Sequence, residues 1–491
     1  MILKELLLRI PYIRKQGSLT LEIVNIVHNS KKVVSGSLFI CVTGMRSDGH
    51  NYVEEAIKGG AIAVVAEREV PVPDDITLIL VDNSRRALSY IAAAFYGYPS
   101  EKMTMIGITG TKGKTTCTYM LEAILEEAGY RTGIIGTIEV SFADKRYESY
   151  NTTPDALLLQ EYLSEMVQSG VECVVMEVSS QGLMLHRTDS IVFDYGIFTN
   201  ISEDHIGPTE HKNFEEYLSC KAKLFSQCKV AIVNSDCEFL PMLLKDATCR
   251  VYTYGLSRTA MLYAQYTGLL QRKGALGISF VTRGCLNYFV ELWLPGVFNV
   301  YNALAAFLTG RQMGINGSIM VTAMSKVSVK GRCELVPVSD DYTTIIDYAH
   351  NADSLYKVLH TIREYHPKRI VCLFGCGGNR DRQRRFEMGE IAAKYSDVVI
   401  VTSDNPREES QSAIIDDIVI GIERYSDSYI RIEDRSEAIH YALDQAIPGD
   451  VILFAGKGHE TYQEICGVRY PMDERVIIEE WKGKERWKHL V

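Results

Sequence analysis

The 491-residue sequence has no uninterrupted apolar run near the length of about 20 residues that a membrane-spanning helix needs. It also lacks any Cys-x-x-Cys pair, so its 12 cysteines do not show the spacing of a zinc finger. Positive charge is not in excess, because the net charge is −10 and the pI is about 5.7. These absences argue against a membrane-spanning, zinc-binding or nucleic-acid-binding protein, although local arginines can still bind an anionic small molecule.

What the sequence does contain is the composition of a soluble globular protein, with 46% hydrophobic and 23% charged residues. At about 100–200 residues per domain, its length predicts about three domains. The segment Met1–Ile10 mixes leucines with charged residues, which is typical of an amphipathic helix and not of a signal peptide. We therefore expect a cytoplasmic monomer with small-molecule substrates and no nucleic-acid or membrane partner.

The central motif is the run Gly110-Thr111-Lys112-Gly113-Lys114-Thr115-Thr116, which lies between an apolar segment and a helix-like segment. A strand, a glycine-rich turn and a helix start in this order form a phosphate-binding loop. Its backbone N–H groups close on phosphate oxygens, Lys114 reaches the terminal phosphates, and a Thr115 or Thr116 hydroxyl can hold magnesium. Ile108 stands where the strict pattern has its first glycine, so an ordinary strand-to-helix turn is the alternative, but the context favours a nucleotide site.

The pattern of apolar runs along the chain predicts three domains of the α/β class. Residues 1–99 hold short apolar runs between helix-like stretches, which predicts a small α/β domain that ends at the linker Tyr98-Pro99-Ser100. Residues 100–330 follow as a central parallel-sheet ATPase domain built on the phosphate-binding loop. Residues 331–491 contain four strand–loop pairs between helical segments, which predicts a doubly wound, Rossmann-like domain.

Two loops of the first domain are rich in hydrogen-bond donors. They are Asn29–Lys32 and Thr43–His50, and their composition suits an anionic ligand. From these residues alone, a solvated loop is an equally good interpretation.

Polar side chains follow two apolar strands of the central domain. The run Val171–Ser180 is typical of a buried parallel strand and ends in polar side chains that include Glu177 and Ser179. Because ligands bind at the carboxyl ends of parallel strands, Glu177 is a candidate metal ligand or catalytic carboxylate, with a surface carboxylate as the alternative. His205 follows the next strand, at 195–200, and could complete a magnesium shell near an ATP site, although a single histidine in a loop is usually structural.

Together these motifs resemble the Mur ligases of peptidoglycan synthesis, and among them the branch that adds a diamino acid to UDP-N-acetylmuramoyl-L-alanyl-D-glutamate. The resemblance covers nearly the whole chain and rests on the number and order of the motifs. They are Gly110–Thr116, Asn151–Asp155, Glu177–Leu183, His186-Arg187, Asp204-His205, Asn299–Asn302, Asp347–His350, Gly375–Asp381, Asp404–Arg407 and Gly456–Glu460.

The resemblance implies an ATP-dependent ligase that joins a carboxylate to an amine. Because an amine does not attack a carboxylate directly, ATP first converts the carboxylate to an acyl phosphate and ADP leaves. The loop lysine and two magnesium ions would neutralise charge on the transferring phosphoryl group. By resemblance, Thr115 and Glu177 hold one magnesium ion, and His205 with a carbamylated Lys221 holds the other.

Carbamylation makes chemical sense of a lysine as a metal ligand, because CO2 added to the neutral amine yields an anionic oxygen. From the sequence alone, Lys221 and Lys223 would be the solvated face of a helix at 214–225. The resemblance favours Lys221, and Lys223 is the weaker candidate because residues two apart on a helix project to different faces.

The resemblance also assigns substrate contacts in all three domains. Contacts to uridine and the muramoyl dipeptide fall on Ser30, Asn151, Thr152, Thr153, Ser179 and Arg187. Contacts to ATP fall on the loop itself, Gly110, Thr111, Lys112, Gly113, Lys114, Thr115 and Thr116, and on Asn302, Arg332, Asp347 and His350. Contacts to the incoming amino acid fall on Arg380, Asp404, Asn405, Arg407, Gly456 and Glu460.

The run Asp404–Arg407 indicates which amino acid is added. It matches the family motif for meso-diaminopimelate, in which the arginine binds the distal carboxylate through a bidentate pair and Glu460 meets the distal ammonium. L-Lysine lacks that carboxylate and would leave Arg407 unpaired, at a cost of roughly 1–3 kcal/mol or more. We therefore expect diaminopimelate as the substrate, with L-lysine or another amino acid as the alternative.

Several residues depart from the family pattern, namely Lys31, Lys112, Gln181, Ile206–Thr209, Asn351-Ala352 and Glu408–Gln411. These departures leave open a divergent paralogue with an altered substrate. A ligase of the folylpolyglutamate or cyanophycin type would share the loop without needing Asp404–Arg407. A nucleotide-binding scaffold would bind ATP without amino-acid-dependent phosphate release. Three domains that each contribute one substrate also predict hinge closure.

Overall fold

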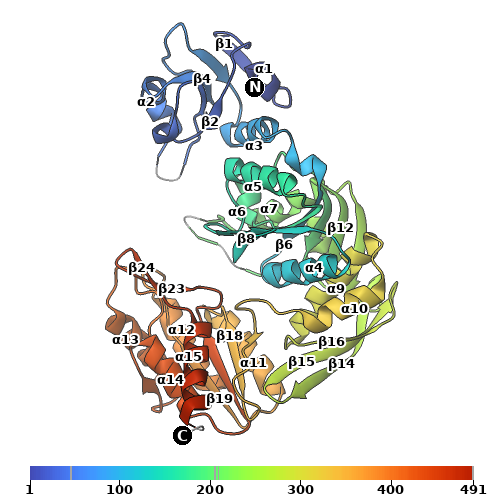
Figure 1. The fold of residues 1–491 in the computed structure, drawn as a ribbon, viewed down its shortest axis with the longest axis vertical. Helices are drawn as coiled ribbons and strands as arrows, with labels where there is room; N and C mark the ends of the chain where they lie inside the picture. The colour runs from blue at the N-terminus through green and yellow to red at the C-terminus, as the bar shows by residue number, and fades with distance from the viewer. Residues whose placement is uncertain (45–46, 204–205, 208–209, 489–491) are drawn as a thin grey trace. The chain divides into compact units, whose positions relative to one another are not determined.

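A computed structural model gives the fold of residues 1–44, 47–203, 206–207 and 210–488 (Figure 1). Contacts divide the chain into unit 1, residues 1–254 with 308–313, and unit 2, residues 255–307 with 314–491. Both units combine helices with largely parallel sheets, which confirms the predicted α/β class. The predicted domain boundaries after residues 99 and 330 stay predictions. No helix in the described ranges is both long and apolar enough to cross a bilayer.

The first sheet of unit 1 has the strand order β1-β5-β4-β3-β2, and only β1 runs antiparallel to its neighbour. Side chains alternate between its faces, since Leu38 and Ile40 join one hydrophobic cluster and Phe39 joins another. Helices α1 and α3 contribute to the first cluster and α2 to the second. The elements are α1 (Leu3–Leu6), β1 (Ile13–Gln16), β2 (Asn25–Val27), β3 (Ser37–Ile40), α2 (Val53–Lys58), β4 (Ala61–Ala66), β5 (Thr77–Leu80) and α3 (Ser84–Phe95).

The amphipathic helix predicted over Met1–Ile10 is limited to the four residues of α1, so that prediction was wrong in extent. The backbone N–H groups of Leu3 and Lys4 donate to the carbonyls of Leu21 and Leu19. The start of the chain is therefore paired with a neighbouring segment, which provides acceptors for N–H groups that have no partner inside a helix.

The second sheet of unit 1 carries the phosphate-binding loop. Within the unit its strand order is β13-β12-β11-β6-β10-β7-β8-β9, in which β8 and β9 are antiparallel and the other pairings are parallel. The strands are β6 (Thr104–Thr109), β7 (Thr132–Ile135), β8 (Glu139–Phe142), β9 (Lys145–Glu148), β10 (Cys173–Glu177), β11 (Phe193–Phe198), β12 (Cys228–Asn234) and β13 (Arg250–Gly255).

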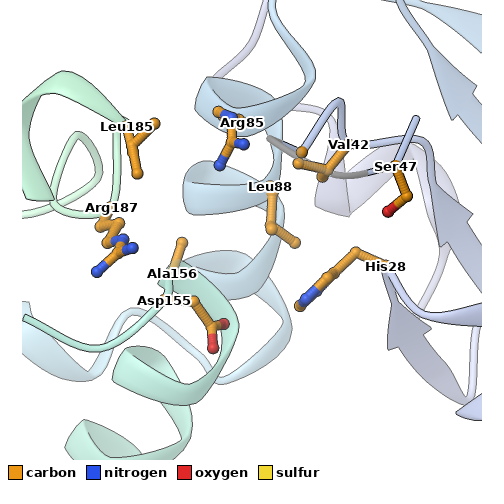
Figure 2. Close-up of a pocket in the computed structure, with 10 residues that line it drawn as sticks. His28, Val42, Ser47, Arg85, Leu88, Asp155, Ala156, Leu185 and Arg187 are labelled. Atoms are coloured by element: carbon orange, nitrogen blue, oxygen red, sulfur yellow. The ribbon is translucent and has the colours of Figure 1, made fainter. Parts of the chain in front are cut away.

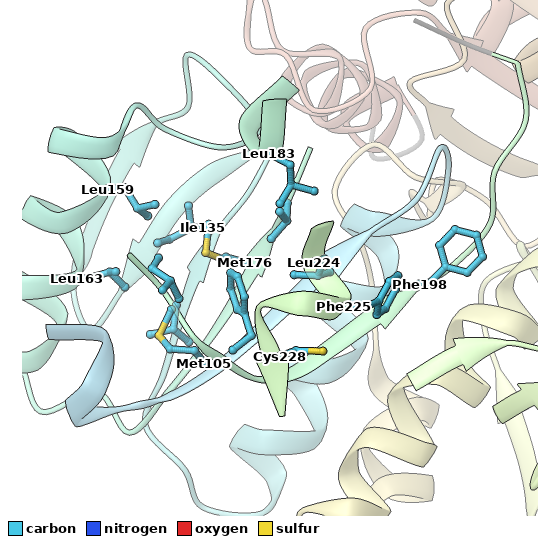
Figure 3. Packing of buried hydrophobic residues seen from close by; sticks show 14 of the residues in the cluster. Met105, Ile135, Leu159, Leu163, Met176, Leu183, Phe198, Leu224, Phe225 and Cys228 are labelled. Atoms are coloured by element: carbon cyan, nitrogen blue, oxygen red, sulfur yellow. The ribbon is translucent and has the colours of Figure 1, made fainter. Parts of the chain in front are cut away.

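A continuous apolar core fixes this second sheet against its helices (Figure 3). Met105 of β6, Met176 of β10 and Phe198 of β11 are fully buried in one cluster with Leu163 and Leu224. These last two belong to the helices α5 and α7, and the helices of the sheet are α4 (Lys114–Glu127), α5 (Ala156–Gln168), α6 (Ser180–Met184), α7 (Phe214–Ser226) and α8 (Leu240–Leu243). The carboxyl ends of β6 and β10 are thereby held in fixed register, Glu177 opposite Ile108.

Unit 2 contains antiparallel strands followed by a doubly wound sheet. The antiparallel strands are β14 (Leu262–Arg272), β15 (Ala275–Gly284) and β16 (Phe289–Leu292). They are followed by α9 (Val297–Gln312), whose residues from 308 onward are assigned to unit 1, and by α10 (Gly317–Lys326). The doubly wound sheet has the order β17-β18-β22-β19-β20-β21, with only β17 antiparallel. Its strands are β17 (Glu334–Leu335), β18 (Thr343–Asp347), β19 (Arg369–Phe374), β20 (Val398–Val401), β21 (Ile430–Arg431) and β22 (Asp450–Ala455).

Helices cover both faces of the doubly wound sheet, as the Rossmann-like prediction requires. Apolar side chains of α11, α12 and α13 join one buried cluster, and those of α14 and α15 join the other. These helices are α11 (Ala352–Glu364), α12 (Gln383–Tyr395), α13 (Gln411–Ile422), α14 (Arg435–Asp444) and α15 (Glu474–Lys488), and a hairpin of β23 (Tyr462–Ile465) and β24 (Val468–Pro471) follows β22. The loops after β18, β19, β20 and β22 therefore leave one edge of the sheet, where ligands bind in this architecture.

Candidate active site

The phosphate-binding loop joins β6 to α4. Gly110 has a φ of +149° and Gly113 a φ of +85°, and a Cβ at Gly110 would lie 1.9 Å from Thr199 Oγ1, so both positions require glycine. Lys114 Nζ donates to the carbonyls of Gly110 at 2.9 Å and Thr111 at 3.1 Å. The ammonium therefore lies against the same loop as the first N–H groups of α4, which is an arrangement suited to a phosphate group.

Two residues after β11 hold the loop in shape. Asn200 accepts the Lys112 N–H at 3.0 Å and donates its amide to the Lys112 carbonyl at 3.0 Å. The Thr199 hydroxyl donates to the same carbonyl at 2.7 Å. The sequence indicated a strand ending at these residues but gave them no role, because their partner lies almost 90 positions away in the chain.

Glu177 lies at the carboxyl end of β10 and is 1% exposed. Its carboxylate accepts the Thr115 hydroxyl at 3.1 Å, the Thr137 hydroxyl at 3.0 Å and the Thr137 N–H at 2.8 Å. A Cβ at Gly136 would lie 2.6 Å from Glu177 Oε1, so glycine leaves room for this carboxylate. Thr115 and Glu177 are thus brought together as predicted, whereas the sequence did not single out Thr137.

Lys221 is buried on α7, while Lys223 on the same helix is only half-buried. Lys221 Nζ donates to the Gly110 carbonyl at 3.0 Å and lies 4.4 Å from the centroid of the Tyr217 ring. The side chain therefore reaches the phosphate-binding loop and does not form a solvated face.

His205, the other predicted ligand, lies outside the described residues. The ranges that the structure describes hold no group of three or more His, Cys, Asp or Glu side chains able to bind a metal.

Three of the residues predicted to contact the muramoyl dipeptide form one hydrogen-bonded group beside β10. Thr153 Oγ1 donates to the Glu177 carbonyl at 2.9 Å and accepts the Ser179 N–H at 2.9 Å. Arg187 donates to the Thr153 carbonyl at 2.6 Å. Thr152 is nearby, since its hydroxyl lies 3.0 Å from that of Thr137.

The other two predicted contacts are placed differently. Ser30 donates to Glu55 Oε2 at 3.0 Å within the first sheet's domain. Asn151 is exposed, and its carbonyl accepts the Ser149 hydroxyl at 3.0 Å. Neither residue belongs to the hydrogen-bonded group around Thr153.

A cavity of about 260 Å³ lies within unit 1 next to this group (Figure 2). Its lining includes Arg187, Arg85 of α3 and two residues of the donor-rich loop predicted to suit an anion, Gly44 and Ser47. Burial lowers the pKa of both guanidinium groups, while the Asp155 carboxylate, which also lines the cavity, raises the pKa of Arg187 and Arg85 lowers it. With two guanidinium groups and one carboxylate named in its lining, the cavity favours an anionic ligand. The sequence did not single out Arg85.

The predicted nucleotide contacts beyond the loop belong to unit 2. Asn302 is buried on α9, where its amide donates to Asn299 Oδ1 at 3.2 Å. Asp347 ends β18 and accepts the backbone N–H groups of Cys333 at 2.7 Å and Ala349 at 2.8 Å. Burial raises the pKa of the Asp347 carboxyl.

Arg332 and His350 flank a tyrosine in the same unit. The Arg332 guanidinium lies 4.7 Å from the centroid of the Tyr348 ring, and His350 Nδ1 lies 2.8 Å from the Tyr348 carbonyl. The His459 ring packs on Tyr348 at 4.8 Å between centroids. Burial lowers the pKa of His459 to about 3, and Arg332 lowers it further, so the imidazole is neutral at pH 7.

The predicted amino-acid contacts gather where the loops after β20 and β22 meet. Asn405 donates its amide to Glu460 Oε2 at 2.8 Å. A Cβ at Gly456 would lie 2.8 Å from Asp404 Oδ2, so this glycine allows the two loops to approach. Arg380 is exposed in the loop after β19.

Arg407 is held in an unusual backbone conformation at the edge of this cluster. Its φ is +53°, a left-handed value that L-residues rarely adopt. Its N–H donates to the Glu464 carbonyl at 3.0 Å, and Cys466 N–H donates to its carbonyl at 2.7 Å, so the hairpin β23–β24 imposes the conformation. Its guanidinium donates to the Gly378 carbonyl at 2.6 Å and lies 3.4 Å from Glu464 Oε2.

Comparison with known proteins identifies the class of this chain. Three family profiles match in chain order: "Mur ligase family, catalytic domain" at residues 22–96, "Mur ligase middle domain" at 108–310 and "Mur ligase, glutamate ligase domain" at 331–458. The chain belongs to the Mur ligase family, which confirms the resemblance found in the sequence. It is therefore an amide-bond-forming ligase, in a family whose members are ATP-dependent.

Individual relatives narrow this assignment. The UDP-N-acetylmuramoyl-L-alanyl-D-glutamate–2,6-diaminopimelate ligase of Caldanaerobacter subterraneus subsp. tengcongensis is 44% identical over 468 residues, 95% of this chain and 96% of the relative. The UDP-N-acetylmuramoyl-L-alanyl-D-glutamate–2,6-diaminopimelate ligase 1 of Clostridium acetobutylicum is 41% identical over 484 residues, which are 98% of this chain and 99% of the relative. A solved structure of a ligase with the same name is 29% identical, covers 99% of each chain and has a TM-score of 0.72.

The fold is shared more widely within the family. A crystal structure of the MurF ligase from Thermotoga maritima in complex with ADP has a TM-score of 0.61 at 19% identity, covering 95% of this chain and 98% of that one. At that identity the similarity concerns the fold alone.

Proposed function

We propose that this chain is an ATP-dependent ligase that adds meso-diaminopimelate to UDP-N-acetylmuramoyl-L-alanyl-D-glutamate, with ADP and phosphate as the other products. The observation that carries the proposal is the cluster of Asn405, Arg407 and Glu460 on adjoining loops, in a chain whose curated relatives bear that name. The Arg407 guanidinium would pair with the distal carboxylate of the amino acid and Glu460 with its distal ammonium. L-Lysine, which lacks the carboxylate, is the second candidate substrate.

In unit 1 the phosphate-binding loop would hold ATP so that its terminal phosphoryl group passes to the carboxylate of the muramoyl dipeptide. The N–H groups of the first turn of α4 and the Lys114 ammonium are the donors available for phosphate oxygens. The carboxylate oxygen forms the new bond to phosphorus and ADP leaves. The amine then attacks the acyl carbon, phosphate leaves, and the amide is formed.

Magnesium is part of the proposal, and the residues around Glu177 fit it. Glu177 is buried, and its partners in the described structure are the hydroxyl of Thr115 and the hydroxyl and N–H of Thr137, all neutral. A buried carboxylate whose partners among the described residues are neutral, beside a hydroxyl, suits a hard divalent cation. Bound there, Mg²⁺ would stabilise negative charge on the transferring phosphoryl group.

Lys221 is proposed as a second magnesium ligand after carbamylation, together with His205. Its Nζ lies at the phosphate-binding loop, which supports a role at the phosphates. Lys221→Ala should lose activity, and bicarbonate or chloride should restore part of it. The matched variant Lys223→Ala, on the half-buried neighbour, should retain activity. Full activity of Lys221→Ala without any rescue would remove this assignment.

The cavity that Arg85 and Arg187 line is proposed to take an anionic part of the UDP-muramoyl substrate. Arg187 also bonds to Thr153, which joins it to Glu177, so the cavity and the phosphate site share one hydrogen-bonded group. Arg85→Ala should raise the KM for the UDP substrate and leave the KM for ATP unchanged.

The proposed assignment of substrates is residues 1–99 for the UDP-muramoyl group, 100–330 for ATP and 331–491 for the amino acid. Because these three reactants must meet away from water, the domains are proposed to close on a hinge in a cytoplasmic monomer. Small-angle scattering with and without substrates tests closure, and an unchanged radius of gyration would contradict it.

The function itself is tested with a panel of amino acids. The chain is incubated with ATP, Mg²⁺ and UDP-N-acetylmuramoyl-L-alanyl-D-glutamate, and phosphate release and product mass are measured. We expect the mass of the diaminopimelate adduct and much weaker product formation with L-lysine. Equal turnover of both amino acids would refute the specificity, and release that does not depend on the UDP substrate would favour a ligase of another branch.

A further inference from the structure

A lysine that the proposed function does not use lies at the centre of the amino-acid cluster. The side chain of Lys457, in the turn after β22, is fully buried. Its Nζ donates to Asn405 Oδ1 at 2.8 Å, to Glu460 Oε2 at 2.8 Å and to the Tyr462 carbonyl at 2.5 Å. An ammonium group has three N–H bonds, so these three acceptors use all of them.

Burial of this ammonium is not explained by stability alone. Removing two charges from water costs free energy that a buried ion pair often only just recovers, and an apolar side chain of similar volume is often as stable. Lys457 is therefore better explained by what its charge does to its two neighbours, both of which belong to the predicted amino-acid site.

The first neighbour, Asn405, is fixed in one amide orientation. Its Oδ1 accepts from Lys457 Nζ and from the Glu464 N–H at 2.9 Å, while its Nδ2 donates to Glu460. The opposite orientation would place the NH2 group against two donors and the oxygen against a carboxylate. Asn405 can therefore offer a ligand only an N–H group.

The second neighbour, Glu460, is fixed with one oxygen already used. Its Oε2 accepts from both Lys457 and Asn405. Within the part of the chain that the structure describes, no hydrogen bond is made by Oε1, and the side chain is 16% exposed. Glu460 therefore has one oxygen left for a ligand that donates, such as an ammonium.

We infer that Lys457 is a positioning residue that sets the polarity of the amino-acid site. Its ammonium fixes Asn405 as a hydrogen-bond donor and leaves one oxygen of Glu460 available as an acceptor. The carboxylate of one amino-acid centre can then accept from Asn405, and the ammonium of the same centre can donate to Glu460. The inference rests on the proposed function and deepens it, because it states why this pair would recognise the zwitterionic end of a diamino acid.

The test compares the folded full-length chain with Lys457→Met, which keeps the length of the side chain and removes its charge. The matched control is Arg369→Met, which breaks an ion pair with buried Asp450 where β19 and β22 begin, at the opposite edge of the same sheet. Thermal unfolding is measured for each variant, together with the separate KM values for diaminopimelate, ATP and the UDP substrate.

We expect Lys457→Met to raise the KM for diaminopimelate about 10- to 100-fold, the range for loss of charge-assisted hydrogen bonds, with unchanged KM for ATP and the UDP substrate. Arg369→Met should lower thermal stability and leave all three KM values unchanged. Lys457→Gln, which keeps N–H donors without the charge, should give a KM for diaminopimelate between those of the unmodified chain and Lys457→Met. It replaces Lys457→Met in the test if that variant does not fold.

An unchanged KM for diaminopimelate in a folded Lys457 variant would overturn the inference while leaving the proposed function intact. A lower unfolding temperature with no selective change in KM, as in the control, would also overturn it, since the role would then be structural only. No ligation of any diamino acid by the unmodified chain would overturn the proposed function, and this inference with it.

Discussion

Two carboxylates that follow parallel strands, Glu177 in unit 1 and Glu460 in unit 2, are held by opposite kinds of partner. Glu177 accepts from two hydroxyl groups and one backbone N–H, all neutral donors in the described structure. Glu460 accepts from the Lys457 ammonium and the Asn405 amide. The described partners of the first carboxylate carry no charge, whereas one partner of the second is a buried ammonium group.

This difference assigns the two sites different tasks. Neutral donors fix the position of Glu177 without reducing its attraction for a cation, so the site can bind a metal ion and help to stabilise a phosphoryl group. At Glu460 the buried Lys457 ammonium and the Asn405 amide fix the orientation of the carboxylate, so we propose that this site selects a ligand by the arrangement of its donors and acceptors. We therefore propose that the same residue type serves catalysis in unit 1 and specificity in unit 2.

The strongest test of this comparison is Glu177→Gln, which keeps the shape of the side chain and removes its charge. We expect kcat to fall about 100- to 1000-fold, as for loss of one group that stabilises the transition state, with a higher Mg²⁺ concentration needed for half-maximal rate. Phosphate release measured against Mg²⁺ concentration checks both. Glu460→Gln is the matched variant, and it should raise the KM for diaminopimelate without changing the Mg²⁺ dependence. A Mg²⁺ dependence unaffected by Glu177→Gln would contradict the comparison.

The next effect in size concerns Arg407. Arg407→Ala should lower kcat/KM for diaminopimelate about 100-fold or more, because the distal carboxylate loses a charged partner. Turnover of L-lysine should change little, so the ratio between the two amino acids is the measurement. Arg384→Ala, an exposed arginine on α12, is the control and should leave that ratio unchanged.

A smaller effect is expected from Thr137→Val, which removes one neutral donor from Glu177 and keeps the backbone N–H bond. We expect a loss of roughly 3- to 10-fold in kcat, the range for one neutral hydrogen bond. Ser226→Ala, which removes an exposed hydroxyl bonded to the Lys223 carbonyl, provides the control in the same unit. A loss as large as that of Glu177→Gln would mean that Thr137 itself contacts the reacting groups.

The smallest effect is on the pH dependence of stability, through His459 in unit 2. Its pKa is lowered from 6.5 to about 3 in the fold, so the unfolded chain binds a proton that the folded chain does not. The free energy of unfolding should therefore decrease as the pH falls from about 6.5 toward 3. His459→Phe, which keeps a ring against Tyr348, should show a smaller fall in unfolding temperature between pH 7 and pH 5. An identical fall in both proteins would contradict this cause.

Most of the fold and the phosphate-binding loop could be predicted because their signals are local. Buried parallel strands appear as apolar runs, and the run Gly110–Thr116 contains its own turn and helix start. Glu177 could be identified because a carboxylate inside an apolar run is unusual.

The supporting groups could not be predicted, because their partners are distant in the chain. Thr137 lies 40 residues from Glu177, and Lys457 lies 52 residues from Asn405. Thr137 has an ordinary sequence environment, and Lys457 lies in the motif Gly456–Glu460 without a role assigned to it there. Only the strand order brings Thr137 to Glu177 and Lys457 to Asn405.

The left-handed backbone at Arg407 would affect which variants survive a selection for thermal stability. A non-glycine residue at such a φ costs of order 1–2 kcal/mol, which glycine would avoid. A laboratory screen for heat resistance alone should therefore enrich Arg407→Gly, and the survivors should have lost their preference for diaminopimelate. If Arg407 has the proposed role, thermal robustness and substrate choice are opposed at this one position of the chain.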